Sequence, residues 1–247
     1  MKKLVVLTGA GISAESGFST FRDNNGYWDK YPVERVASTQ GWAADPDYVN
    51  AFYNMMRRQL IDAKPNRGHE ILAELQEDFD VSVITQNVDD LHERAGSRNV
   101  IHLHGELMRT CSSRDVEDPR YWRTMTPDCL EVGPGELCDD GSLRRPYIVF
   151  FGEQVPKLQQ AAEEVMRADA FAVVGSSLVV YPAAGLVAYV RRGVPIYVID
   201  PKPVSIPTDH PVHLIQDVAS RGMAELARRL REGNVAAQRS GAYSERV

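Results

Sequence analysis

The fold is decided close to the start of the chain by residues 4–14, which read LVVLTGAGISA. Residues 4–8 are aliphatic or β-branched and favour a buried strand. Gly9, Gly11 and Ala14 follow directly and form the pattern G-x-G-x-x-A. In a Rossmann-type unit these positions allow a tight turn and the close approach of a pyrophosphate to the N-terminus of the next helix. The stretch therefore predicts a dinucleotide-binding unit, and a glycine-rich turn without a ligand is the alternative.

Further short apolar runs alternate with helical patterns along the rest of the chain. They lie at residues 81–85, 100–103, 147–151, 171–175 and 195–200. These runs are apolar on both sides, as are strands of a parallel sheet that is covered on both faces. A helix is predicted from Pro46 to about Asp62, with Asp45 as its N-cap, and helical spacing marks residues 70–76 and 218–230. This alternation predicts an α/β fold with a doubly wound parallel sheet.

Two stretches interrupt the alternation. Residues 24–63 are rich in aromatic residues, and residues 107–146 contain all three cysteines among many Pro, Gly, Asp and Arg residues. Both are too long for ordinary loops, so we expect them to form a smaller inserted module beside the sheet. The expected division is a Rossmann-like domain of residues 1–24, 64–106 and 147–235, a small module of residues 25–63 and 107–146, and a flexible tail of residues 236–247.

Composition excludes several classes of protein. The chain has 247 residues, of which 25% are charged and 43% hydrophobic, which is ordinary for a globular protein. A net charge of −6 argues against a broad nucleic-acid-binding face. The first apolar run, Leu4 to Leu7, is too short for a signal peptide or a membrane span, and three cysteines fit a reducing compartment. We therefore expect a cytoplasmic protein with no nucleic-acid or membrane partner.

Polar residues follow several of the predicted strands. Residues 86–90, QNVDD, follow the second strand, where the carboxyl ends of strands face the ligand crevice of an open α/β sheet. One of Asp89 and Asp90 is expected to cap the next helix, which leaves Asn87 and the other acid as site candidates. Later strands end in residues 175–177, GSS, and in Asp200, which suit phosphate and ribose hydroxyls respectively.

The acid that holds the ribose in an ordinary Rossmann dehydrogenase is missing. It would close a second strand about twenty residues after the glycine motif. Asp23 and Asp29 lie at that distance, but in a polar aromatic loop. Hydride transfer is therefore less favoured than another use of the nucleotide.

A pair of histidines ends another strand, in residues 101–105, IHLHG. Alternation places His102 and His104 on one face at the crevice end. A zinc pair would need a third ligand, and none lies nearby in sequence, so a general base is the preferred interpretation. Two structural histidines are the alternative. His69, His92, His210 and His213 are interpreted as structural.

Taken in order, these motifs resemble the sirtuin family of NAD-dependent protein deacylases. They are GAGISAESG at 9–17 with Phe21-Arg22, TQNVD at 85–89, HGEL at 104–107, FGE at 151–153, GSS at 175–177 and YPAAG at 181–185. The resemblance runs from Leu4 to about Leu230. It implies that NAD is consumed and that the products are free lysine, nicotinamide and acylated ADP-ribose.

The resemblance also implies roles for individual residues. His104 would be the general base on a ribose hydroxyl, Asn87 would position a water, and Asp89 would hold the nicotinamide carboxamide. The cofactor would be contacted by Gly9, Ala10, Gly11, Ile12, Ala14, Phe21, Arg22, Tyr27, Trp28, Gln86, Asn87, Val88, Asp89, Gly175, Ser176, Ser177, Asp200 and Ala219. The substrate peptide would pair as a strand between Phe151-Gly152-Glu153 and Leu178-Val179.

The chain departs from the family at the metal site. The small module of sirtuins usually binds zinc with two C-x-x-C pairs. Here residues 111–114 read CSSR and residues 138–141 read CDDG, so each pair lacks one thiol, and Cys129 lies between them. We predict that no structural zinc binds and that packing and local turns hold the module.

A second departure concerns the acyl group. Some sirtuins carry a Tyr and, three residues later, an Arg that read the carboxylate of succinyl or malonyl lysine. The chain resembles this class at Tyr53 but has Met56 in place of the Arg. Met is apolar and offers no charge, although Arg57 lies on the same side of the helix as Tyr53. We predict that neutral acyl groups are removed better than succinyl. The alternative is that Tyr53 and Met56 are core residues only.

Two other functions remain as alternatives to deacylation. One is a protein that senses NAD or ADP-ribose without turnover, and the other is an ADP-ribosyltransferase. His104, Asn87 and Asp89 favour the enzyme over the sensor, because a sensor needs no general base.

Overall fold

The computed structural model describes residues 1–17, 30–204, 206 and 208–244, with side chains described up to Gly233. Phe21, Arg22, Tyr27 and Trp28, which the sequence assigns to the cofactor, lie outside the described residues.

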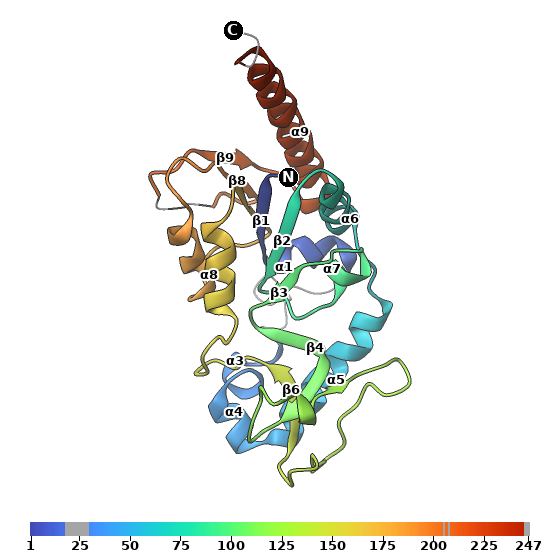
Figure 1. Ribbon diagram of the computed structural model, residues 1–247. Coiled ribbons are helices and arrows are strands. Elements are labelled where there is room, and N and C mark those ends of the chain that lie inside the picture. Colours follow the sequence, from blue (N-terminus) through green and yellow to red (C-terminus); the bar gives the residue numbers. More distant parts are fainter. Residues whose placement is uncertain (18–29, 205, 207, 245–247) are drawn as a thin grey trace.

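A six-stranded parallel sheet lies at the centre of the larger part of the molecule (Figure 1). Its strands, in spatial order, are β3 (Val100–His102), β2 (Asp80–Thr85), β1 (Lys3–Thr8), β7 (Ala170–Val174), β8 (Ile196–Ile199) and β9 (Val212–Ile215). The chain leaves β1 toward β2 and β3 on one side and returns to β7 on the other. The strand order therefore reverses between β1 and β7, at the switch point where open α/β sheets bind ligands. The predicted doubly wound fold is confirmed.

Both faces of the sheet are covered, as the apolar runs predicted. Leu4 and Val6 of β1 pack toward α6 (Arg67–Glu74) and α9 (Ala219–Ser244). Val5 and Leu7 pack toward α8 (Leu158–Met166) and the 3₁₀ helix η4 (Ala183–Tyr189) on the other face. Each fully buried side chain of this kind contributes roughly 1.5–3 kcal/mol, so the two layers hold the sheet rigid beneath the crevice.

The two insertions form one small module beside the sheet (Figure 1). Three helices, α3 (Val33–Val36), α4 (Thr39–Ala44) and α5 (Pro46–Asp62), accompany an antiparallel sheet of order β5-β4-β6. Its strands are β4 (Gly105–Ser112), β5 (Arg123–Thr124) and β6 (Arg144–Ile148). The helix α5 begins as predicted, because Asp45 Oδ1 accepts a hydrogen bond from the Tyr48 N–H at 3.0 Å.

Short elements complete the described part of the chain. They are the helices α1 (Ala10–Ser13) and α7 (Leu91–Arg94) and the 3₁₀ helices η1 (Ala14–Ser16), η2 (Leu75–Glu77) and η3 (Pro119–Tyr121). Of these, α1 and α7 follow β1 and β2 at the crevice end of the sheet (Figure 1).

The structure corrects three expectations. The run 147–151 does not join the parallel sheet, because β6 ends at Ile148 and pairs antiparallel with β4. The edge strand β9 was not predicted, since only Ile215 of its four residues is buried. The helix α9 continues past Leu230, where the predicted helix ends, and the segment expected as a flexible tail is helical as far as Ser244. Residues 231–244 contain no proline, so nothing in their backbone chemistry stops the helix.

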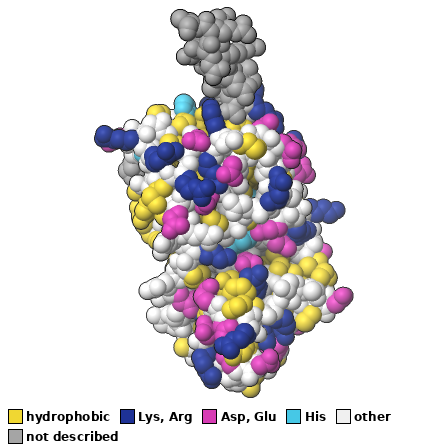
Figure 2. Space-filling model, in the orientation of Figure 1, with side chains coloured by type: hydrophobic (Ala, Val, Ile, Leu, Met, Phe, Trp, Pro, Cys, Tyr) yellow, Lys and Arg dark blue, Asp and Glu magenta, His cyan; other side chains and the backbone are white. Residues whose placement is uncertain are grey.

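No helix in the described ranges has the length and apolar character that crossing a membrane requires. Acidic and basic side chains are interspersed over the face shown in Figure 2.

Candidate active site

Two glycine turns meet at the carboxyl ends of β1 and β7. The Gly9 N–H donates to Val174 O at 3.0 Å, and the Gly11 N–H donates to Gly175 O at 2.9 Å. A Cβ on Gly11 would lie 2.6 Å from the Gly175 Cα atom, and Gly175 itself has φ of +61°. Neither position can therefore carry a side chain without a shift of backbone. This contact leaves backbone and no side chains at the switch point, which is the surface that a pyrophosphate needs.

The loop after β2 is tied to both glycine turns by side chains. Asn87 Nδ2 donates to Gly9 O and to Ser13 Oγ, each at 3.1 Å. Gln86 Nε2 donates to Ser176 Oγ at 2.8 Å. Residues predicted from three separate strand ends are therefore joined in one hydrogen-bonded site.

Asp89 is buried at the centre of this site. Its Oδ2 atom accepts from the Ser13 hydroxyl at 3.0 Å, and its Oδ1 atom accepts from the Leu91 N–H at 3.2 Å. Burial raises the pKa of Asp89 to about 6, against the opposing effects of those hydrogen bonds and of the positive charge of His102. Asp90 occupies the N-cap position of α7 but makes no side-chain capping bond. The Leu91 N–H at the start of α7 is therefore bonded by Asp89, the acid that also accepts from Ser13 of the glycine turn.

His104 lies directly after β3, with its imidazole against the same loop. Its Nδ1 atom is 2.9 Å from Gln86 O. A carbonyl oxygen only accepts, so Nδ1 carries the hydrogen and the lone pair is on Nε2. Burial lowers the pKa of His104, although the Gln86 carbonyl opposes this. The imidazole is therefore neutral near pH 7 and chemically suited to act as a base.

His102 contacts the next carbonyl of the same loop. Its Nδ1 atom is 3.1 Å from Asn87 O, and its Nε2 atom is 2.7 Å from Glu93 Oε1 on α7. The described residues contain no cluster of three or more His, Cys, Asp or Glu that could hold an ion.

The other cofactor residues predicted in the described ranges lie around the same edge of the sheet. Ile12 and Ala219 are buried at the starts of α1 and α9, and Ser177 is exposed after β7. Asp200 follows β8, and its Oδ1 atom accepts from the Lys202 N–H at 2.8 Å. Val88 instead packs in the core of the small module, where its carbonyl accepts from the Leu107 N–H at 2.7 Å.

Sequence reasoning missed Asn66, a residue that organises the site. Asn66 donates to Ile12 O at 2.7 Å and to Ser16 Oγ at 2.9 Å while its Oδ1 atom caps α6. The N-cap signal of Asn66 is visible in the sequence, but its contacts to the glycine turn are not. Leu178 has φ of +55°, a strained conformation for a branched side chain, in the segment assigned to the peptide.

His69 on α6 and His92 on α7, both interpreted as structural, lie against each other. Both are fully buried, with ring centroids 4.9 Å apart, and His92 Nε2 is 3.0 Å from Thr8 Oγ1. Burial lowers the pKa of His69 to about 4, so the ring is neutral near pH 7. The pair packs behind the carboxyl ends of β1 and β2.

The peptide segment is less open than predicted. The Phe151 N–H donates to Ala37 O at 2.8 Å, and Phe151 O accepts from the Thr39 N–H at 3.2 Å. The Glu153 N–H is also used, by Phe150 O at 3.0 Å. Within this segment, the N–H and C=O groups of Gly152 and the C=O group of Glu153 have no hydrogen bond to the described residues. These backbone groups are available for the predicted pairing with a peptide, which stays a prediction.

The helix α5 places the three acyl-pocket candidates in different environments. Tyr53 and Met56 are buried in the small-module core with Phe150. Arg57 is also fully buried, but its Nε atom donates to Leu107 O at 2.8 Å and its Nη1 atom to Asn54 Oδ1 at 2.9 Å. The bond to Leu107 O ties α5 to β4, and the bond to Asn54 lies within α5. Nη2 has no partner among the described residues.

The two incomplete cysteine pairs, at residues 111–114 and 138–141, lie in a hydrogen-bonded cluster. Asp140 accepts from the Ser112 hydroxyl at 2.7 Å and from the Ser142 N–H at 2.9 Å, and its carbonyl accepts from Arg114 at 3.0 Å. Cys138 Sγ donates to Cys111 O at 3.6 Å. Burial raises the pKa of the Cys111 thiol to about 12, which favours the neutral thiol over the thiolate that binds metals.

Together, the switch-point crevice and the neutral His104 beside it define a nucleotide-dependent enzyme of the Rossmann-like class. The sequence matches the Sir2 family over residues 9–182. An NAD-dependent protein deacylase of Bacteroides thetaiotaomicron is 56% identical over 226 residues, which cover 92% of this chain and 97% of the relative. The chain belongs to the Sir2 family, the sirtuins.

Solved structures agree with this assignment. A Sir2 homologue in complex with NAD is 42% identical, with a TM-score of 0.82 over 94% of this chain and 90% of that chain. A Sir2 structure that holds a deacetylated peptide and 3′-O-acetyl-ADP-ribose is 36% identical, with a TM-score of 0.74 over 93% of this chain and 92% of that chain.

Proposed function

We propose that this sirtuin is an NAD-dependent protein-lysine deacylase, which releases nicotinamide and moves the acyl group from lysine to ADP-ribose. The observation that carries the proposal is the neutral His104, fixed by Gln86 O beside the glycine crevice. The relatives at high identity are named NAD-dependent protein deacylases, and one related structure holds both expected product types.

The crevice fits the dinucleotide on steric grounds. Gly9 and Gly11 pack directly against the Gly175 turn, where a Cβ would collide with backbone, so the two turns present backbone rather than side chains to a pyrophosphate. Ser176 lies beside this turn for a phosphate oxygen, and Asp200 lies beyond β8 for a ribose hydroxyl. NAD, when bound, supplies an electrophilic ribose carbon and nicotinamide as the leaving group.

The residues of the chain then divide the work. Asp89 accepts hydrogen bonds from the nicotinamide carboxamide, for which its carboxylate must be ionised. Asn87, held by Gly9 O and Ser13 Oγ, orients a water in the same pocket. His104 Nε2 takes the proton from a ribose hydroxyl, because its Nδ1 is already committed to Gln86 O. Gly152 and Leu178-Val179 hold the substrate backbone.

The acyl pocket favours neutral groups. Met56 takes the place of the Arg that would pair with a succinyl carboxylate, and the two bonds of Arg57 hold its guanidinium against β4. Burying an unpaired carboxylate costs several kcal/mol, enough to reverse a preference. Acetyl or longer neutral acyl lysine is therefore the proposed substrate.

The small module is proposed to hold its structure without bound zinc. Its stability is supported by the Ser112–Asp140–Ser142 cluster and by the Arg57 and Asn54 bonds that join α5 to the 130–132 segment. The sparse cysteines and the buried thiols of Cys111 and Cys138 suit the cytoplasm, which we propose as the location.

Incubation of the protein with NAD and an acetyl-lysine peptide tests the function. Mass spectrometry should show free lysine peptide, nicotinamide and acetyl-ADP-ribose together. Binding of NAD without product would favour the sensor, and covalent labelling of protein would favour the ADP-ribosyltransferase.

A further inference from the structure

His102 is built against the same loop as the catalytic base but has no assigned role. It ends β3, and its side chain is 6% exposed. The two histidines contact consecutive carbonyls, His104 at Gln86 O and His102 at Asn87 O. The loop between β2 and α7 is therefore held by two imidazoles, of which only one is needed as a base.

Both ring nitrogens of His102 face acceptors. Nδ1 points to Asn87 O at 3.1 Å and Nε2 to Glu93 Oε1 at 2.7 Å. A neutral imidazole has one N–H and can satisfy only one of them, whereas an imidazolium satisfies both. Burial lowers the pKa of His102, but the hydrogen bond and charge of Glu93, helped by Glu106 and Asn87 O, outweigh it and raise the pKa. The two acceptors and the raised pKa therefore favour the imidazolium form of the ring.

Several other groups surround the pair. They are His92 on α7, Asp89 and Asp90 in the loop after β2, Glu106 on β4 and Lys157 before α8. Burial keeps His92 neutral, with its pKa well below the usual range. Lys157 lowers the pKa of Glu93 and pairs with Glu106 at 3.6 Å. Among the groups that act on Asp89, His102 carries the positive charge. This charge favours the ionised form of the Asp89 carboxylate.

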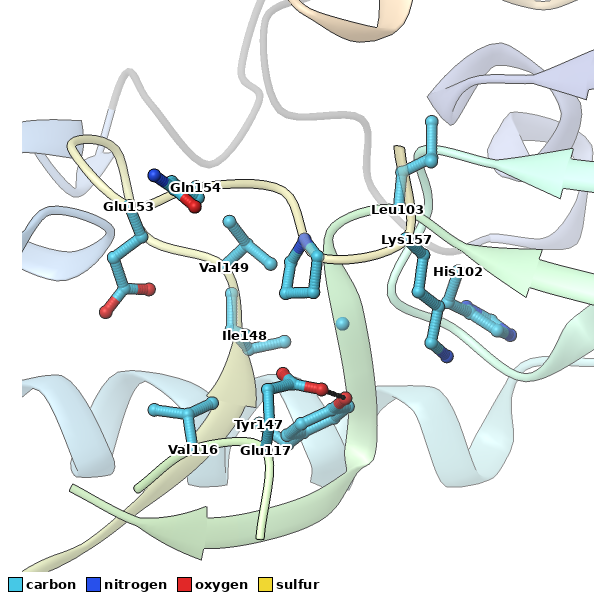
Figure 3. Close-up of a pocket in the computed structure, with 12 residues that line it drawn as sticks. His102, Leu103, Val116, Glu117, Tyr147, Ile148, Val149, Glu153, Gln154 and Lys157 are labelled. Atoms are coloured by element: carbon cyan, nitrogen blue, oxygen red, sulfur yellow. Dashed lines mark hydrogen bonds between the residues drawn. The ribbon is translucent and has the colours of Figure 1, made fainter. Parts of the chain in front are cut away.

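A cavity also borders His102. Its volume is about 210 Å³, and His102 and Lys157 lie along one side of it, with Glu117 and Tyr147 on another (Figure 3). Glu93 is itself 42% exposed. The ion pair can therefore exchange protons with solvent without passing through the cofactor crevice.

We propose that the His102–Glu93 pair is a positioning element for the proposed deacylation, on which this inference rests: the imidazolium fixes the Asn87 carbonyl and directs its positive charge at Asp89. Glu93 keeps His102 charged and oriented. His102 does not touch the reacting atoms and acts through Asn87 and Asp89. Loss of the charge should therefore leave NAD binding largely intact and alter how activity depends on pH.

The experiment compares His102→Gln and Glu93→Gln with the wild type. Gln at position 102 can still donate to Asn87 O but carries no charge, and Gln at position 93 keeps the shape of Glu93. His213→Gln is the matched control, because His213 lies on the exposed edge strand β9. We would measure kcat and KM for NAD and acetyl peptide from about pH 5 to pH 9, NAD binding, and Tm for each protein.

Asp89 without the nearby cation is harder to ionise, so the acid limb of kcat/KM should move to higher pH by about half a unit or more in His102→Gln. That displacement is a roughly threefold loss on the limb and almost none above it. Glu93→Gln should move the limb in the same direction, and the double variant should move it no further than His102→Gln alone. His213→Gln should match the wild type.

An unmoved limb in both variants would overturn the proposal, as would an equal loss of activity at every pH. If His102→Gln does not fold, Glu93→Gln alone decides, because its partly exposed side chain can change without disrupting the core. A wild type that binds NAD but never deacylates would instead contradict the proposed function, so the two failures are distinguishable.

Discussion

The Nδ1 atom of His104 lies 2.9 Å from the carbonyl oxygen of Gln86, and this contact fixes the tautomer of the imidazole. The hydrogen is on Nδ1 and the lone pair on Nε2, which is the form that a general base requires. Gln86 in turn donates to Ser176 at the glycine crevice. The candidate base is therefore oriented by the same residue that links the loop to Ser176.

Replacement of the base tests its role. His104→Ala should lower kcat by about 10²–10⁴-fold, because that is the usual contribution of general base catalysis. NAD binding, measured by calorimetry, should persist, since the glycine cradle is unchanged. His213→Ala serves as the control. Turnover close to that of the wild type in His104→Ala would return His104 to a structural role.

The pH dependence of activity should have an acid limb near the pKa of Asp89. Activity needs Asp89 ionised and His104 neutral; the pKa of Asp89 is raised to about 6 and that of His104 is lowered. As pH falls through about 6, Asp89 gains a proton and turnover should decline. A flat profile of kcat/KM from about pH 5 to pH 8 would contradict the assignment.

The raised pKa of Asp89 also predicts that neutralising this carboxylate stabilises the fold but lowers activity. The folded-state pKa of about 6 lies above the ordinary value of 3.8, so ionised Asp89 destabilises the fold above pH 6, and stability is regained as pH falls toward 4. Asp89→Asn should therefore be more stable than the wild type by roughly 1–3 kcal/mol at neutral pH, yet much less active. Urea unfolding at two pH values measures the difference. A less stable Asp89→Asn would show that its hydrogen bonds outweigh its buried charge.

Zinc should be dispensable. Protein purified without added metal should contain far less than one zinc per chain, and a chelator should leave its Tm unchanged. Ser112→Ala should destabilise the module by roughly 1 kcal/mol, because it removes the hydroxyl that donates to Asp140. Near-stoichiometric zinc would refute this prediction and make Cys111 and Cys138 the candidate ligands.

Acyl preference depends on Met56. On one peptide sequence, kcat/KM for acetyl and for a longer neutral acyl lysine should exceed that for succinyl lysine, and Met56→Arg should improve the succinyl substrate. Arg57→Met should instead destabilise the fold by roughly 1–3 kcal/mol, because Leu107 O and Asn54 lose their donor. Succinyl preferred by about tenfold, roughly 1.4 kcal/mol, would overturn the prediction. If Arg57→Met abolished that succinyl preference, Arg57 Nη2 would be identified as the donor that binds the succinyl carboxylate.

The sequence predicted the part of the site that strand ends determine. Gly9, Asn87, His104 and Ser176 all follow strands of one parallel sheet, and their carboxyl ends must meet at one edge. Pattern and spacing are therefore enough to place these four residues at one edge of the sheet.

What the sequence could not predict depends on pairing between distant segments. The backbone of Phe151 is already bonded to Ala37 and Thr39, and this is invisible in an FGE motif. Alternation along the strand places His102 on the same face as His104, but it cannot show that the partner of His102 is Glu93 on the helix α7. The run 147–151 is as apolar as a parallel strand, but only its first two residues belong to β6, and a short apolar run does not indicate which sheet it joins.

The central claim is that NAD cleavage is coupled to removal of an acyl group from lysine at the His104 site. The most direct measurement is the ratio of nicotinamide released to lysine peptide deacylated, followed by chromatography over the same time course. The structure predicts equal amounts of the two products, and neither in the absence of acyl peptide or with His104→Ala. Nicotinamide released without deacylated peptide, or deacylation without NAD, would contradict it.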